Sequence, residues 1–312
     1  MIRRFFAVLA TVCICQMTYG SVWAAGAIPV WVALSENGGP HAEAAAVLRA
    51  EVDQVLPGRV EWRIAHWSQF TASGPEPQWI VTVGTAALKG MQDLFARDTK
   101  PPPMLAILVP RLAFERIADP VRVRAGSVSA VFLDQPPARQ LELIQLALPD
   151  AHSVGILVSS QTKVHVPALE AAARERGFKL VSSAVEQGGL YPALQSLLPD
   201  IDVFLALPDP AVFNSQTAGN ILTAAYRRQV PLIGFSAAYV KAGALLALYS
   251  TPYQVGARGG ELLRLVLAGK PLPPPQAPRE FAVEVNQNVA RSLGLVLDEA
   301  RLGELLRQKG RP

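Results

Sequence analysis

Residues 231–249, PLIGFSAAYVKAGALLALY, decide the fold of this chain. Pro231–Phe235 is a short apolar run that fits a buried strand, and it ends in a polar Ser-Ala-Ala-Tyr turn. A glycine-containing corner follows, and Ala244–Tyr249 is a second apolar run. The stretch therefore predicts two buried strands, with polar residues at the end of the first.

The same pattern recurs along the chain, where short apolar runs alternate with helical patterns, as is typical of a parallel sheet. The other runs predicted as strands are Ile28–Leu34, Val60–Ala65, Trp79–Val83, Met104–Val109, Ser127–Leu133, Ser153–Ser159, Phe178–Ser182, Val203–Leu207 and Phe281–Val285. The spacing of apolar residues predicts helices over His41–Leu56, Arg139–Leu148, Pro167–Arg176, Ala211–Arg228 and Tyr253–Leu267.

The number of strands favours two sheets, because one sheet of ten or more strands would be large. Proline-rich breaks near 134–137, at Tyr249–Pro252 and at Lys270–Pro278 mark three crossings between the sheets. We therefore predict an α/β fold of two Rossmann-like lobes with parallel sheets, joined by a three-crossing hinge. The expected lobes are residues 28–133 with 250–278, and residues 134–249 with 279–312.

Residues 1–27 have the order of a secretory signal peptide. An Arg-Arg pair comes first, Phe5–Met17 is an apolar core too short to span a bilayer comfortably, and small residues precede Ile28. Both cysteines, Cys13 and Cys15, lie in this leader, so the mature chain would contain none. An uncleaved N-terminal anchor and a lipoprotein are the alternatives.

The composition argues against several classes of function. The net charge of +4 is too small to indicate nucleic acid or an anionic membrane as a partner. The four histidines show no metal-ligand spacing, and no phosphate-binding glycine loop is found. Ser160-x-x-Lys163 has the spacing of a penicillin-recognising nucleophile, but its partner motifs are missing. We predict no catalytic residues, no metal and no cofactor.

Four stretches of the chain carry a family resemblance. They are WIVTVGTAAL from Trp79, AVFLDQPPARQLELIQLALPDAHSVGILVS from Ala130, ALPDPAVFNSQT from Ala206 and EFAVEVNQNVARSLGL from Glu280. Together with the opening stretch they resemble the ABC transporter substrate-binding protein family, in the branch that includes tryptophan- and tyrosine-binding members. The resemblance implies the type 1 periplasmic binding protein fold and a periplasmic, monomeric receptor without membrane insertion after leader cleavage.

In such a receptor a small solute binds between the lobes and is delivered to an ABC permease. A binding protein that feeds a membrane sensor uses the same two-lobed shell and is the alternative. A secreted α/β enzyme is the third hypothesis, and the sequence offers no acid/base pair for it.

Ligand-binding residues are expected just after strand ends, where two α/β lobes face each other. Thr85 and Ser236 begin helices and are best placed for an anionic group. Asp209 stands between two prolines and could form a turn, while Tyr239 could pack inside a lobe. The predicted set is Ser35, Glu36, Thr85, Arg111, Ser160, Asp209, Asn214, Ser236 and Tyr239.

The ligand class is predicted from the carboxylates of the cleft. Relatives that bind amino acids often carry acidic residues after Gly234, where this chain has Phe235 and Ser236. Glu36 and Asp209 are then the candidate partners for a ligand ammonium. We therefore expect a neutral or anionic aromatic or apolar solute in place of tryptophan, tyrosine or phenylalanine.

Overall fold

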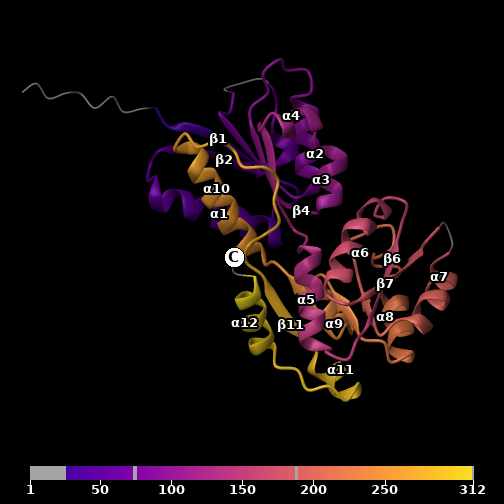
Figure 1. The fold of residues 1–312 in the computed structure, drawn as a ribbon. Helices are drawn as coiled ribbons and strands as arrows, with labels where there is room; N and C mark the ends of the chain where they lie inside the picture. The colour runs from indigo at the N-terminus through magenta and orange to yellow at the C-terminus, as the bar shows by residue number, and fades with distance from the viewer. Residues whose placement is uncertain (1–25, 73–75, 187–188, 311–312) are drawn as a thin grey trace, which may run out of the picture.

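The computed structural model describes residues 26–72, 76–186 and 189–310, so residues 1–25 of the predicted signal peptide lie outside the described residues. The described chain forms two α/β lobes, each built on one sheet (Figure 1). We call the lobe with the five-stranded sheet lobe 1 and the lobe with the six-stranded sheet lobe 2. No helix in these three ranges has both the length and the apolar character needed to cross a membrane.

Lobe 1 has parallel strands in the order β2-β1-β3-β4-β5. They are β1 (Ile28–Leu34), β2 (Val60–His66), β3 (Trp79–Val83), β4 (Met104–Val109) and β5 (Val128–Phe132). Helices cover both faces, so the inner strands are almost wholly apolar. One face packs against α1 (Gly39–Val55) and α10 (Pro252–Leu267), the other against α2 (Thr85–Leu94), α3 (Arg111–Ile117) and α4 (Pro120–Arg124).

Lobe 2 has the strand order β11-β10-β9-β8-β6-β7, with only β11 antiparallel to its neighbour among the pairs described. The strands are β6 (Ser153–Val158), β7 (Lys179–Ala184), β8 (Val203–Leu205), β9 (Leu232–Gly234), β10 (Leu246–Tyr249) and β11 (Ala282–Val285). One face carries α5 (Pro137–Ala147), α6 (Val166–Glu175), α11 (Gln287–Ser292) and α12 (Glu299–Lys309). The other carries α7 (Leu190–Leu197), α8 (Ala218–Arg227) and α9 (Ala237–Ala242).

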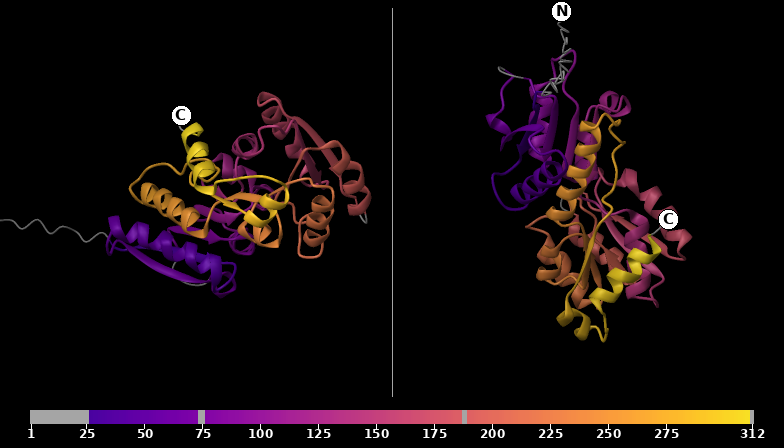
Figure 2. Two further views of the ribbon diagram at one scale, coloured as in Figure 1. Left: turned by 90° about the horizontal axis from the view of Figure 1, so that it is seen from below. Right: turned by 90° about the vertical axis from the view of Figure 1, so that its left-hand side faces the viewer.

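The chain passes between the lobes three times, as the proline breaks predict. It crosses from β5 to α5, from β10 back to α10, and from α10 to β11. On the third passage Gln276 first pairs with β5, since its N–H donates to the Ala130 carbonyl and its carbonyl accepts from Phe132, both at 2.9 Å. Figure 2 (right) shows this segment running from α10 along lobe 1 to lobe 2.

A buried polar network ties the three crossings together. Gln135 of the first crossing donates from Nε2 to Ser250 Oγ of the second at 2.8 Å. Ser250 Oγ in turn donates to the Glu280 carbonyl of the third at 2.6 Å. Arg139 Nη1 completes the network with hydrogen bonds to Gln135 Oε1 at 2.7 Å and to the Pro278 carbonyl at 3.0 Å. We call these groups the hinge network.

The predicted strands all form, with ends that shift by one or two residues. The prediction of a helix over Ala211–Arg228 is wrong at its start, because α8 begins at Ala218. Residues 211–217 are instead folded into turns by the side chains of Asp209 and Asn214. The predicted Ser-Ala-Ala-Tyr turn is the beginning of α9, with Ser236 in the N-cap position.

Close packing of α10 on α1 gives the first testable prediction. A Cβ at Gly256 would lie 2.5 Å from the Ala44 carbonyl oxygen, so Gly256→Val must push the two helices apart. We expect the free energy of unfolding to fall by about 1–3 kcal/mol or more, as overpacked cores generally show. Chemical denaturation measures it. Gly219→Val is the matched control, since nothing lies within 4 Å of its Cβ position on α8; an equal loss in both variants would contradict the packing argument.

Candidate functional site

The candidate site lies between the lobes, at the carboxyl ends of their parallel strands. A cavity of about 150 Å³ is lined from both lobes and from the first crossing. A second cavity of about 250 Å³ adjoins it and shares Asp134, Gln135, Gln140 and Pro208. Ligands of open α/β sheets bind outside the carboxyl ends of the strands, so this position fits a binding cleft.

An aromatic cluster forms the lobe 2 wall of the smaller cavity. The Phe235 ring lies 4.7 Å from that of Tyr239, and the Phe213 ring packs edge-on against both at 6.2 and 6.3 Å. Phe213 and Phe235 line the cavity, while Tyr239 is buried behind them over Gly234. A Cβ at Gly234 would lie 2.6 Å from the Tyr239 Cβ, so the glycine is needed for this stacking.

Asp134 is the acidic group of the cleft and lines both cavities. Its Oδ2 accepts a hydrogen bond from the Arg111 N–H at 2.5 Å. Burial raises the pKa of the Asp134 carboxyl, although that hydrogen bond and the charges of Arg111 and His165 act in the opposite direction. The guanidinium of Arg111 pairs with Glu115, at 2.8 Å, so it does not neutralise Asp134 by a direct ion pair. A half-buried carboxylate beside an apolar cavity is suited to a cationic group of a ligand.

Sequence reasoning missed Asp134 and read it as part of a proline-containing break. The pattern that could have identified Asp134 is its position directly after a predicted strand, which it shares with the predicted site residues. The structure thus adds Asp134 to Glu36 and Asp209 as a candidate carboxylate of the cleft, and the expectation of a neutral or anionic solute did not take it into account.

Of the predicted residues of lobe 1, Thr85 lines a groove beside the cleft and Arg111 lines the larger cavity, whereas Ser35 and Glu36 are not among the lining residues. Ser35 Oγ accepts from the Ala87 N–H at 2.9 Å and so fixes the start of α2. Glu36 is exposed, with its carboxylate 3.8 Å from His41. Thr85 is exposed at the start of α2, and Arg111 begins α3 beside Asp134. Arg111 is thus the predicted residue that the fold brings to the acidic group.

The predicted residues of lobe 2 divide between the cleft and the protein interior. Asp209 has no exposed surface, and its carboxylate accepts from the N–H groups of Ser159 and Ala211 at 3.0 Å and from Thr162 Oγ1 at 2.5 Å. Asn214 caps its own turn through both ends of its amide. The structure therefore favours the turn-forming role for both residues.

The other predicted residues of lobe 2 take three different positions. Ser160 is exposed at the end of β6, and Ser236 is half-buried with no side-chain hydrogen bond to the start of α9. Burial raises the pKa of the Tyr239 hydroxyl, which agrees with its place behind the aromatic wall.

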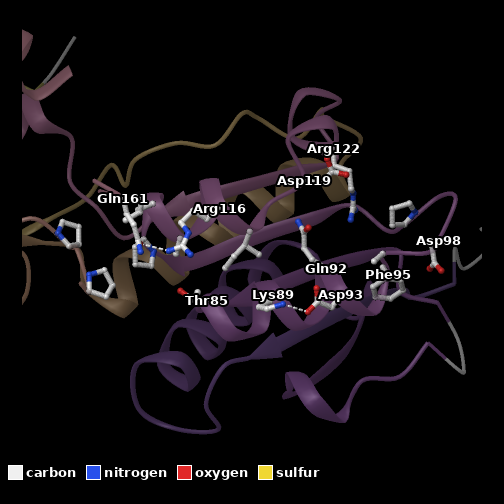
Figure 3. Close-up of a pocket in the computed structure, with 18 residues that line it drawn as sticks. Thr85, Lys89, Gln92, Asp93, Phe95, Asp98, Arg116, Asp119, Arg122 and Gln161 are labelled. Carbon is white, nitrogen blue, oxygen red and sulfur yellow. Dashed lines mark hydrogen bonds and ion pairs between the residues drawn. The ribbon is translucent and has the colours of Figure 1, made fainter. Parts of the chain in front are cut away.

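A long groove of about 880 Å³ continues from the cleft along lobe 1. Figure 3 shows it between α2, which contributes Thr85, Lys89 and Gln92, and the segment that carries Arg116 and Arg122. Lobe 2 contributes Gln161, Pro208 and Pro210 at one end. Pro208 and Pro210 also line the small cavity, so groove and cavity are continuous. In the described part of the chain, no cluster of three or more His, Cys, Asp or Glu side chains could hold a metal ion.

Residues 115–305 match the model of a family described as ABC transporter substrate binding protein. This chain belongs to that family. A tyrosine-binding protein of Clostridioides difficile (strain R20291) is 23% identical over 163 residues, which are 50% of this chain and 47% of that protein. The chain thus spans about half the length of this curated relative.

Solved structures share the fold of this substrate-binding protein. The ligand-free, open structure of a substrate binding protein with adhesive properties from Clostridium difficile has a TM-score of 0.66 and 18% identity, covering 87% of this chain and 96% of that one. An ABC domain in complex with L-Trp from Streptococcus pneumonia has a TM-score of 0.59 and 18% identity, with 88% and 97% covered. A conserved domain protein from Vibrio cholerae has a TM-score of 0.61 and 20% identity, covering 88% of this chain and 97% of that one. The predicted family resemblance and the type 1 binding-protein fold are confirmed.

The raised pKa of Asp134 predicts that its ionised carboxylate lowers the stability of this substrate-binding protein. Because the folded state holds the Asp134 proton more tightly than the unfolded chain, its carboxyl lowers the free energy of unfolding as the pH rises above the ordinary range of aspartic acid. Asp134→Asn keeps the acceptor for the Arg111 N–H and removes the charge. We expect a higher melting temperature than the reference protein at pH 7 without solute, and a difference that shrinks toward pH 4. A lower melting temperature at pH 7 would show that the charged form stabilises the fold.

We expect Asp209 to contribute mainly to the stability of the fold. Asp209→Ala removes the acceptor of the Ser159 N–H and of the Thr162 hydroxyl, both buried. We expect the free energy of unfolding to fall by about 3 kcal/mol, since hydrogen bonds to charged groups contribute about 1.5–3 kcal/mol. Asp200→Ala, at an exposed position, should change it by less than about 0.5 kcal/mol. An unchanged denaturant midpoint for Asp209→Ala would contradict this structural role and favour the predicted ligand-binding role of Asp209.

Proposed function

We propose that this chain is an extracytoplasmic receptor that captures a small solute between its lobes and delivers it to an ABC importer. One observation carries the proposal: a desolvated carboxylate, Asp134, borders an aromatic-walled cavity between two lobes that three crossings connect. Family membership supports the transport role. The receptor binds its solute without turnover, and residues 1–27 direct its export.

The proposed solute carries an ammonium group and an apolar or aromatic part. The ammonium would pair with Asp134, whose charge otherwise remains desolvated. The apolar part would contact Phe213 and Phe235, which line the same cavity. The relative from C. difficile is a tyrosine-binding protein, and the S. pneumonia structure is a complex with L-Trp. Aromatic amino acids are therefore the first candidates, in place of the solutes expected from the sequence.

Binding would be coupled to closure of the lobes about the hinge network. A solute in the smaller cavity contacts Pro110 of lobe 1 as well as Asp134 and the aromatic wall of lobe 2. It therefore favours the arrangement in which these groups are close, and the closed population rises by its preference for that state. We propose that the moving units are residues 28–133 with 250–278, and residues 134–249 with 279–312.

Native mass spectrometry of the protein from the periplasmic fraction tests export and capture together. We expect a chain that begins near residues 25–28 and a bound small molecule. Calorimetric titration of the solute-free protein with L-tyrosine, L-tryptophan and L-phenylalanine should then give micromolar or tighter binding of at least one. Asp134→Asn should weaken it tenfold or more, since a charge-assisted hydrogen bond contributes about 1.5–3 kcal/mol.

Glu36→Gln is the matched control, because Glu36 is an exposed carboxylate of lobe 1 that lines neither cavity. Loss of binding in Glu36→Gln but not in Asp134→Asn would move the ammonium site to Glu36. A protein that retains no solute and binds none of the three amino acids would contradict the proposed solute class. Turnover of a bound compound would contradict the receptor role.

A further inference from the structure

Two polar contacts join the lobes on the side of α3, away from the chain crossings. Arg116 Nη1 donates to Gln161 Oε1 of lobe 2 at 2.6 Å, and Figure 3 shows this bond at the end of the groove. His165 Nε2 of lobe 2 lies 3.2 Å from Glu115 Oε2. We call these four residues the clasp. None of them belongs to a crossing, so both contacts can break when the lobes separate.

The clasp contains one pair of ionisable side chains from opposite lobes, His165 and Glu115. Its Nε2 is buried and makes no hydrogen bond among the described residues, while the Glu115 carboxylate lies within ion-pair distance. A protonated ring would present an N–H and a positive charge to that carboxylate, and a neutral ring need present neither. Histidine is the ordinary side chain whose charge changes between pH 5 and 8.

The other charged groups near His165 would either attract or repel a positively charged ring. Arg111 holds the other oxygen of Glu115 at 2.8 Å and, being cationic, opposes the ring charge. Asp134, on the first crossing, lines the same cavity as His165, and its carboxylate would attract a positively charged ring. Lys163 lies on the same short 3-10 helix, Lys163–His165, and is exposed. Both carboxylates thus attract the protonated ring, and Glu115 is the one that belongs to the opposite lobe.

We propose that Glu115 and His165 form a proton-dependent lock between the lobes, which closes the clasp as the pH falls from 8 to 5.5. The inference rests on the proposed function, because closure is the step that retains the solute. An exposed ion pair supports a change of about two- to fivefold in the ratio of closed to open molecules. Arg116 and Gln161 hold the rim at every pH, since neither changes charge in this range.

The test measures lobe closure without any solute. In the full chain with Cys13→Ala and Cys15→Ala, nitroxides are attached at Val121→Cys on α4 and Tyr191→Cys on α7, which are 61% and 68% exposed. These helices lie on opposite lobes (Figure 1). Pulsed electron paramagnetic resonance gives the distance distribution between pH 8 and pH 5.5. We expect the short-distance population to grow about two- to fivefold at pH 5.5.

Glu115→Gln and His165→Asn should each abolish this growth, and His152→Asn, an exposed histidine of lobe 2, should keep it. Arg116→Met should lower the short-distance population equally at both pH values. Circular dichroism confirms that each variant is folded, and the two lock variants test the pair independently. Growth that persists in either folded lock variant, or that is absent from the reference protein, overturns the lock. Solute binding that persists in that case leaves the proposed receptor function intact.

Discussion

The hinge network is the constraint on which the rest of the structure depends. Gln135 and Ser250 are 5% and 4% exposed, so their polar atoms must find partners inside the protein. They find them in one another and in the Glu280 carbonyl, and each of the three crossings contributes one of these groups. Separating the crossings would leave buried donors and acceptors without partners, so the lobes are fixed to each other along this edge.

The position of Asp134 follows from this constraint. It precedes Gln135, whose two amide ends are held by Ser250 and Arg139, so the backbone that carries the carboxylate has little freedom. The carboxylate is therefore kept where both lobes restrict its access to water, and its raised pKa is the result. The carboxylate that is expected to weaken the solute-free fold would be the partner of the proposed ammonium group, as is common where a binding site and stability oppose each other.

The sequence predicted the architecture well because strands, helices and proline breaks are local signals. It predicted the site less well, and Asp134 and Asp209 show why. Both come just after a buried strand and have a proline within two residues, so these local signals do not tell them apart. In the fold, the Asp209 carboxylate accepts hydrogen bonds from Ser159, Thr162 and Ala211 of adjoining loops, whereas Asp134 lines the cavities. A carboxylate after a strand can accept hydrogen bonds from nearby loops or line the cleft. Which of the two occurs depends on the loops that meet there, and only the tertiary structure shows this.

The lobes meet at two places that differ in strength. The hinge network is buried, and breaking such a network costs several kcal/mol because it leaves desolvated groups unsatisfied. The contacts of α3 with lobe 2 involve partly exposed side chains, and such pairs contribute about 0–1 kcal/mol. A solute that changes the free energy by about 1–3 kcal/mol, or a proton that changes it by up to about 1 kcal/mol, can therefore rearrange the α3 rim but not the hinge. The proposed opening would therefore occur on the side of α3, where the cavities and the groove lie.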